Sequence, residues 1–193
     1  LSPTVTVASD TYADGENIDL VANFGAGNNV DVTGAPSIEI LVGSTSRTAT
    51  YVSGAGTNQL TFRAPVFTGD SDTNGIAIPN PVITLPAGAT IVEDNTNHPV
   101  GLTFAPPANL GNVLVDGIAP AIRPSGGVSL PPGSAYSTGN TLNFTINFDD
   151  AVTYSQGTSP ATLAVTVGNT VRQASIAQPT GTTATSFTFA YQL

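Results

Sequence analysis

A segment near the start of the chain recurs farther along, and this repetition constrains the fold more than any other feature. The stretch Tyr12–Phe24 returns 124 positions later as Tyr136–Phe148, with Tyr, Gly, Asn and Phe at the same places in both. The correspondence continues in order, with small gaps, through five further pairs: Pro36 with Pro160, Gly43 with Gly168, Arg47 with Arg172, Gly54 with Gly181, and Leu60–Phe62 with Phe187–Phe189. An ordered series of this kind is hard to obtain without duplication, so we expect two copies of one domain.

Apolar residues alternate with polar ones in both copies. They stand at every second position, as Ile18, Leu20, Ala22 and Phe24 in the first copy and as Leu142, Phe144, Ile146 and Phe148 in the second. Alternate side chains of a β-strand point to opposite faces, so each run predicts a strand with one face in a core. Turns rich in Gly, Asn and Asp separate the runs, and 15 Pro and 20 Gly disfavour long helices. The sequence therefore predicts an all-β fold of tandem β-sandwiches.

The first copy is expected to span residues 1–118 and the second residues 119–193. The stretch Val113–Pro120 has the character of a last strand followed by a short linker that proline stiffens. Leu193 aligns with Val66, after which the first copy runs for 54 further residues. We therefore expect the second sandwich to be incomplete in this chain, with core side chains exposed and a strand edge unpaired.

The charge of the chain limits its partners. It has 13 acidic residues against four basic ones, all arginine, and a net charge of −9 at pH 7. Such a surface repels phosphate groups, so nucleic acid is not an expected partner, whereas divalent cations are attracted. Cysteine is absent, which excludes disulfides and thiolate metal sites. No apolar run approaches the roughly 20 residues that a membrane-spanning helix needs, so we expect no membrane span in this segment.

Several short motifs follow one another along the first copy. They lie at Tyr12–Ile18, Gly34–Pro36, Ala49–Gly56, Leu60–Phe62, Gly69–Ile76 and Val113–Pro120. In this order they resemble the immunoglobulin-like tandem repeats of large bacterial cell-surface adhesins, and the resemblance covers nearly all of the first copy. The second copy is less similar, because it stops before the acidic loop. The resemblance implies immunoglobulin-like β-sandwiches outside the cell, with neighbouring repeats as partners and calcium often bound in loops or at junctions.

The acidic loop D-S-D-T-N-G, which starts at Asp70, matches the first half of a calcium-binding loop. Asp70, Asp72 and Asn74 are the expected ligands, and Asp116 at the exit of the domain is a lesser candidate. An EF-hand has Glu at the twelfth position, where this chain has Pro81, so a true EF-hand is excluded. An ordinary polar turn explains the same residues about equally well, and the resemblance favours calcium slightly.

No arrangement of residues predicts catalysis. His98 is the only histidine, and no nucleophile motif accompanies it. The adjacent acidic pairs Glu93-Asp94 and Asp149-Asp150 are expected on loop surfaces, because neighbours in sequence rarely face each other across a substrate as glycosidase carboxylates do. Tryptophan is absent, which leaves few aromatic platforms for sugar binding. We therefore expect neither catalytic residues nor enzymatic activity.

The leading hypothesis is a non-catalytic extender at the cell surface, which projects a distal binding domain and which calcium could stiffen. Two alternatives stay open. One is a module that binds carbohydrate or peptide through its loops, and a concave patch of exposed aromatic residues would favour it. The other is a polymerising surface-filament subunit whose second sandwich is completed by a strand from a neighbouring subunit.

Overall fold

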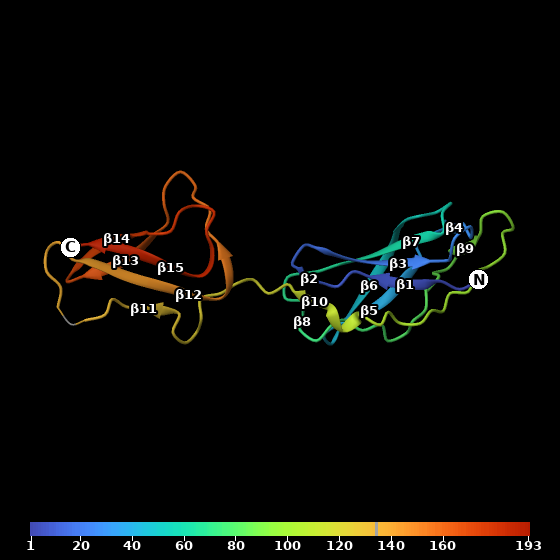
Figure 1. Cartoon of the computed structure of the whole chain (residues 1–193), viewed down its shortest axis with the longest axis horizontal. Coiled ribbons are helices and arrows are strands. Elements are labelled where there is room, and N and C mark those ends of the chain that lie inside the picture. The colour runs from blue at the N-terminus through green and yellow to red at the C-terminus, as the bar shows by residue number, and fades with distance from the viewer. Residues whose placement is uncertain (134) are drawn as a thin grey trace. The chain divides into compact units, whose positions relative to one another are not determined.

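The computed structural model describes residues 1–133 and 135–193, and these residues form β-strands together with one 3-10 turn, η1, at Leu110–Asn112. The contacts divide the chain into two compact units, Leu1–Ala119 and Pro120–Leu193 (Figure 1). The all-β, sandwich-type fold predicted from the alternating pattern is confirmed. No helix in the described part of the chain has the length and hydropathy that crossing a bilayer requires.

Five antiparallel strands form the main sheet of the first unit, in the order β1-β3-β7-β6-β5. Their bounds are Thr4–Val7 for β1, Asn17–Asn23 for β3, Gln59–Pro65 for β7, Thr45–Ser53 for β6 and Ser37–Val42 for β5. The register places Leu20 opposite Phe62 and Ala22 opposite Leu60. All four side chains are fully buried. The alternating apolar residues therefore face the core, as a strand periodicity of two requires.

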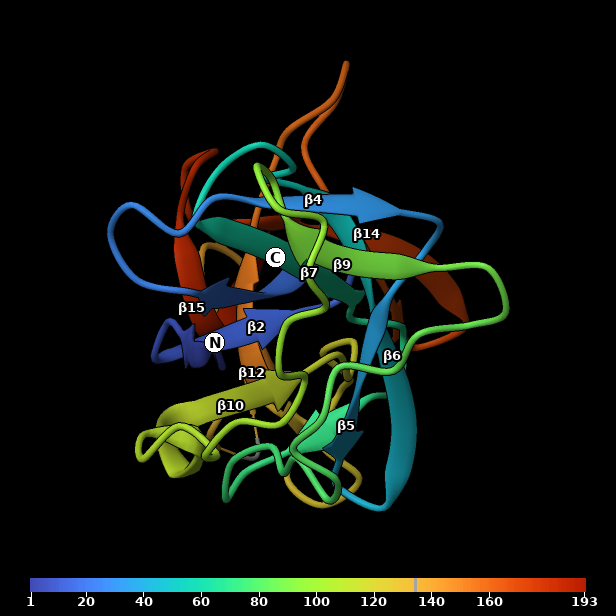
Figure 2. The same cartoon turned by 90° about the vertical axis from the view of Figure 1, so that its right-hand side faces the viewer.

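Two smaller sheets supply the second layer of the first unit. One has the order β2-β10-β8, and the other pairs β4 with β9. The strands are β2 (Asp10–Ala13), β10 (Val113–Asp116), β8 (Ser71–Asp72), β4 (Val30–Thr33) and β9 (Thr90–Glu93). In Figure 2, β2 lies beside β10 and β4 beside β9. Buried residues of both small sheets share one core with the main sheet, which makes this unit a two-layered sandwich.

The chain between β7 and β10 covers the inner face of the main sheet. Together with β10, it contributes eight buried apolar residues to the core: Ile76, Ile78, Ile83, Ile91, Val100, Phe104, Val113 and Val115. The same segment bonds to the outer edge of β5. Ser37 exchanges two backbone hydrogen bonds with Thr84 (3.0 and 2.8 Å), and Leu41 does so with Ala77 (2.7 and 3.0 Å). The segment therefore completes the core and also covers the free edge of the sheet.

The second unit contains one five-stranded sheet with the order β11-β12-β15-β14-β13. The strands are β11 (Val128–Ser129), β12 (Thr141–Thr153), β15 (Thr183–Gln192), β14 (Thr170–Ile176) and β13 (Thr162–Val167). This is the order of the main sheet of the first unit, strand for strand. The register agrees as well, because Phe144 lies opposite Phe189 just as their matched residues Leu20 and Phe62 lie opposite each other.

Turns at matched positions also use matched hydrogen bonds. The amide of Gly15 donates to the carbonyl of Val66 (3.1 Å), and the amide of Gly139 donates to that of Leu193 (2.9 Å). The hydroxyl groups of both repeated tyrosines donate to the carbonyl four residues earlier, from Tyr12 to Ala8 and from Tyr136 to Pro132. The two copies thus share local geometry as well as strand order.

Two matched pairs in the sequence comparison are wrong. The amide of Tyr51 donates to the carbonyl of Pro36 (2.9 Å) and the amide of Ile176 to that of Ala161 (3.0 Å), so Pro36 corresponds to Ala161 and not to Pro160.

The second pair, Gly54 with Gly181, is wrong by two residues. The amide of Gly181 donates to the carbonyl of Tyr154 (2.8 Å), and the amide of Gly56 donates to that of Val30 (2.9 Å). Gly181 therefore corresponds to Gly56 and not to Gly54. The error arose because the hairpin is longer in the second unit, and a glycine-rich turn offers several glycines for alignment.

Within residues 120–133 and 135–193, no strand corresponds to β8, β9 or β10 of the first unit. Residues 154–157, which match β4, are consequently not in a strand, and neither are residues 135–137, which lie in the match to β2. Among the described residues, the second unit therefore has one five-stranded sheet and no second layer over its inner face.

Candidate functional site

Asp70 is buried in the acidic loop and is paired with an arginine. Arg47 donates through Nε to one carboxylate oxygen (3.0 Å) and through Nη2 to the other. The amide of Phe67 donates to the same carboxylate (3.0 Å), and the Arg47 guanidinium lies 5.0 Å from the centre of the Phe67 ring. The hydrogen bond from Arg47 holds the pKa of Asp70 below its ordinary value. Asp70 is only 5% exposed, so its charge is balanced inside the protein.

Asp72 is equally buried, and its carboxylate ties two turns together. One oxygen accepts a hydrogen bond from the amide of Gly43 (2.7 Å), and the other accepts one from the amide of Asn74 (3.2 Å). Asp116 is exposed and accepts a hydrogen bond from the amide of Ile118 (3.3 Å). The pairing of β8 with β10 brings these residues to one end of the unit. Each of the three carboxylates already has a donor from the protein.

These contacts bear directly on the expected calcium site. Calcium takes six to eight oxygen ligands, and an ion at Asp70 would have to displace the guanidinium of Arg47. Among the described residues, no group of three or more His, Asp or Glu side chains is gathered closely enough to hold a metal ion. The residues in this arrangement do not fit a calcium ion without a change of partner at Asp70. Calcium binding by Asp70, Asp72, Asn74 and Asp116 stays a prediction.

The residues considered for catalysis have local partners. His98 is exposed in the turn after β9, and its backbone amide donates to the hydroxyl of Thr96 (3.3 Å). Asp149 and Asp150 lie within β12, in the stretch where its register with β15 shifts, and not in a loop. Asp149 accepts a hydrogen bond from the amide of Ala121 (2.7 Å). This carboxylate is thus tied to the segment that precedes β11.

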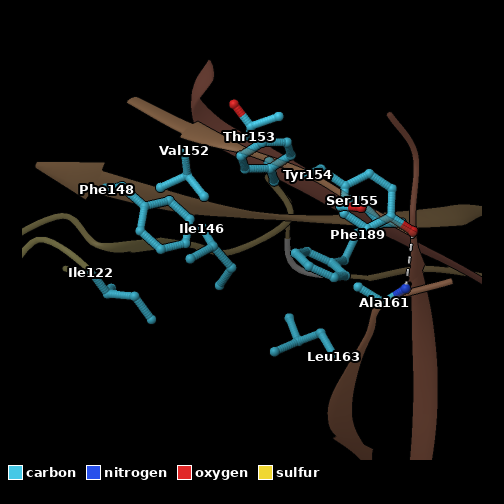
Figure 3. A pocket seen from close by; sticks show the side chains of 12 residues that line it. Ile122, Ile146, Phe148, Val152, Thr153, Tyr154, Ser155, Ala161, Leu163 and Phe189 are labelled. Carbon is cyan, nitrogen blue, oxygen red and sulfur yellow. Dashed lines mark hydrogen bonds between the residues drawn. The ribbon is translucent and has the colours of Figure 1, made fainter. Parts of the chain in front are cut away.

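An apolar groove of about 470 Å³ opens on the second unit (Figure 3). Ile146, Phe148, Leu163, Ile176, Phe187 and Phe189 are among the residues that line it. The rings of Phe148 and Tyr154 each meet the ring of Phe187 edge to face, with centres 6.2 and 6.4 Å apart. The hydroxyl of Tyr154 accepts a hydrogen bond from the amide of Ala161 (3.2 Å), which fixes this ring. Among the described residues, no charged side chain lines the groove, and its lining is mainly apolar.

The lining of this groove matches the core of the first unit. Ile38, Leu60 and Phe62 are completely buried there, and their counterparts are Leu163, Phe187 and Phe189. Leu163 and Phe189 are only partly buried in the second unit. The contrast is large at the edge strand, where Val5 of β1 is 5% exposed and Val128 of β11 is 53% exposed. The groove is therefore the uncovered inner face of a sandwich.

Sequence reasoning missed Arg47 as the partner of Asp70. The signal that could have found it is the small number of basic residues, since the chain has 13 acidic residues and only four arginines. A buried carboxylate needs a counter-charge or several donors, so a buried acid in this chain points to one of the few arginines. Arg63 has a similar role at the surface, where it pairs with Asp19 (2.6 Å).

Comparison of the chain with protein-family models, with curated proteins and with solved structures found no match.

Proposed function

We propose that this chain is a non-catalytic structural segment of an extracellular bacterial surface adhesin, which holds a distal binding domain away from the cell. The observation that carries the proposal is the parallel pair of β2 and β10, which joins the beginning of the first unit to its end. The shared strand order of the two main sheets supports a chain of repeated domains, as does the resemblance of its motifs to adhesin repeats.

Tension along such a protein would act on β2 and β10 in opposite directions. Asp10 pairs with Val113 and Ala13 pairs with Asp116, so the two strands run the same way. A pull toward the N-terminus on β2 and toward the C-terminus on β10 slides the strands past each other. The hydrogen bonds between them then share the load, because evenly spaced parallel bonds are strained together. A spacer under tension needs this resistance.

Single-molecule force spectroscopy of the chain tests the proposal. Leu114→Pro removes one backbone N–H from β10, the central strand of its sheet. We expect the first unit of this variant to unfold at a clearly lower force than in the parent protein. Leu114→Ala keeps the N–H and shortens only a half-buried side chain, so it should unfold near the parent force.

Equal unfolding forces for the parent, the proline variant and the alanine variant would show that the strand pair bears no load, and the spacer role would lose its main support. Saturable binding of a carbohydrate or peptide by the loops of the first unit would instead favour a ligand-binding module. A stiffening role for calcium is a separate part of the proposal, because Asp70 already has Arg47 as its counter-charge.

A further inference from the structure

In the first unit, the segment that follows β7 covers the inner face of the main sheet. Residues 67–116 lie over the main sheet there and bury eight apolar side chains against it. They also bond to the outer edge of β5 through Ser37 and Leu41. The second unit has the same sheet in the same register, and within its described residues nothing takes the place of that segment.

The edge strand β13 of the second unit also has backbone N–H and C=O groups that no strand of the described residues pairs with. β13 is the edge strand of its sheet, and it pairs with β14 in the register that β5 has with β6. Thr162 and Thr166 match Ser37 and Leu41, so their N–H and C=O groups point away from β14, toward solvent. An unpaired edge beside an apolar face is a surface on which another strand can add.

We propose that this face and the outer edge of β13 form one docking surface for a polypeptide segment of the kind that residues 67–116 form in the first unit. Such a segment carries apolar residues at intervals that fit the groove, and it bonds through its backbone to Thr162 and Thr166. The inference goes beyond the spacer role and does not depend on it, because it rests on the matched sheets alone.

The side chains of the face specify the occupant further. Phe144, Ile146 and Phe187 stand where the first unit has Leu20, Ala22 and Leu60. The central strands of the second unit therefore carry larger side chains than their counterparts. A segment that fits this face has smaller residues at the facing positions than residues 67–116 have, since a packed core tolerates little excess volume.

A fusion of residues 67–119 after Leu193 tests the proposal on the full chain. The junction of Leu193 with Phe67 reproduces that of Val66 with Phe67, because Leu193 and Val66 are matched. Two versions are compared, one with the native face and one with Phe144→Leu, Ile146→Ala and Phe187→Leu, which restore the side chains of the first unit. In both versions, we expect hydrogen exchange at the amides of Thr162 and Thr166 to slow by roughly tenfold or more, with the larger effect in the second version. Fluorescence of a dye that binds apolar surface should fall to the level of the first unit.

The control fusion carries Val113→Asp and Val115→Asp in the added segment only, so its length is unchanged while two buried contacts are lost. It should leave both amides unprotected. Unchanged exchange and dye fluorescence in both test versions would overturn the proposal. Sedimentation of the unmodified chain provides a second decisive result. A dimer that already protects Thr162 and Thr166 would show that the occupant is a second copy of the open face, which also overturns it.

Discussion

Asp70 and Arg47 decide how the acidic loop behaves. The carboxylate is 5% exposed and accepts three hydrogen bonds, two from Arg47 and one from the amide of Phe67. These donors, Arg47 first among them, stabilise the charged form of the carboxylate. They therefore lower the pKa of Asp70. Removal of the guanidinium would leave a buried charge with a single weak donor, and such a change costs more than the loss of a surface ion pair.

Arg47→Gln should therefore destabilise the first unit by about 2 kcal/mol at pH 7, less than a fully buried pair would lose because Arg47 is partly exposed. Folding lowers the pKa of Asp70 from its ordinary value of 3.8. The pair thus stabilises the fold above that pH, and its contribution disappears as the pH falls through the folded-state pKa. Urea unfolding of parent and variant from pH 7 down to pH 3 should show the difference shrinking below about pH 4. A constant difference would mean that Arg47 acts through packing on Phe67 and not through charge.

The same two proteins test calcium. In the parent protein Arg47 occupies both oxygens of Asp70, whereas in Arg47→Gln this carboxylate is free to bind an ion. If the loop holds calcium, millimolar calcium should raise the melting temperature of the variant more than that of the parent, relative to chelator. Equal melting temperatures with calcium and chelator in both proteins would leave the loop as an ordinary polar turn.

The hairpin between β6 and β7 shows how a single glycine sets the path of an element. Gly54 follows the last residue of β6 and has a φ of 114°, a conformation that side chains rarely adopt. A Cβ atom at this position would lie 1.9 Å from the carbonyl oxygen of Gln59. The backbone of β7 is therefore close against the turn, and only a residue without a side chain fits there.

Gly54→Ala should destabilise the first unit by roughly 1–3 kcal/mol, because the added methyl forces either the turn or β7 to move. Gly111→Ala is the control, since its Cβ would lie 3.8 Å from its nearest neighbour, the carbonyl oxygen of Asn74, and its φ is not in the left-handed region. Denaturant unfolding of the two variants measures the difference. Similar losses of stability would argue against the close approach of β7 to this turn.

At the scale of the whole molecule, the two units have the same sheet but very different burial. The first unit encloses one continuous core from both layers. In the second unit only Leu142, Ile146, Ala174 and Phe187 are buried apolar residues among those described. Because burial of apolar surface is the main favourable contribution to folding, the second unit should be much less stable than the first.

Hydrogen exchange of the unmodified chain measures this contrast at matched positions. The amide of Leu41 donates to Ala77 (2.7 Å) and should exchange slowly. The amide of Thr166, its counterpart at the open edge of β13, should exchange faster by orders of magnitude. Denaturant should then unfold residues 120–193 before residues 1–119. Equal protection of the two amides would mean that the edge of β13 is covered in solution.

The sequence alone determined the strand periodicity, the correspondence of the two copies and the point where the second copy stops matching. These features are local or are comparisons of the chain with itself, so alternation and turn residues suffice to predict them. The misplaced match of Gly181 marks the limit of this reasoning, since loop lengths differ while strands keep their register.

Only the tertiary structure decided the partners of the charged residues and the roles of residues 67–116. The loop of Asp70 has the pattern of a cation site, yet the residue that balances its charge is Arg47, which lies 23 positions earlier, in β6. Short-range patterns cannot specify such a contact, because it depends on which strands become neighbours when the sheets pack. The parallel pairing of β2 with β10 has the same origin, since it joins two segments a hundred residues apart that only the closed sandwich brings together.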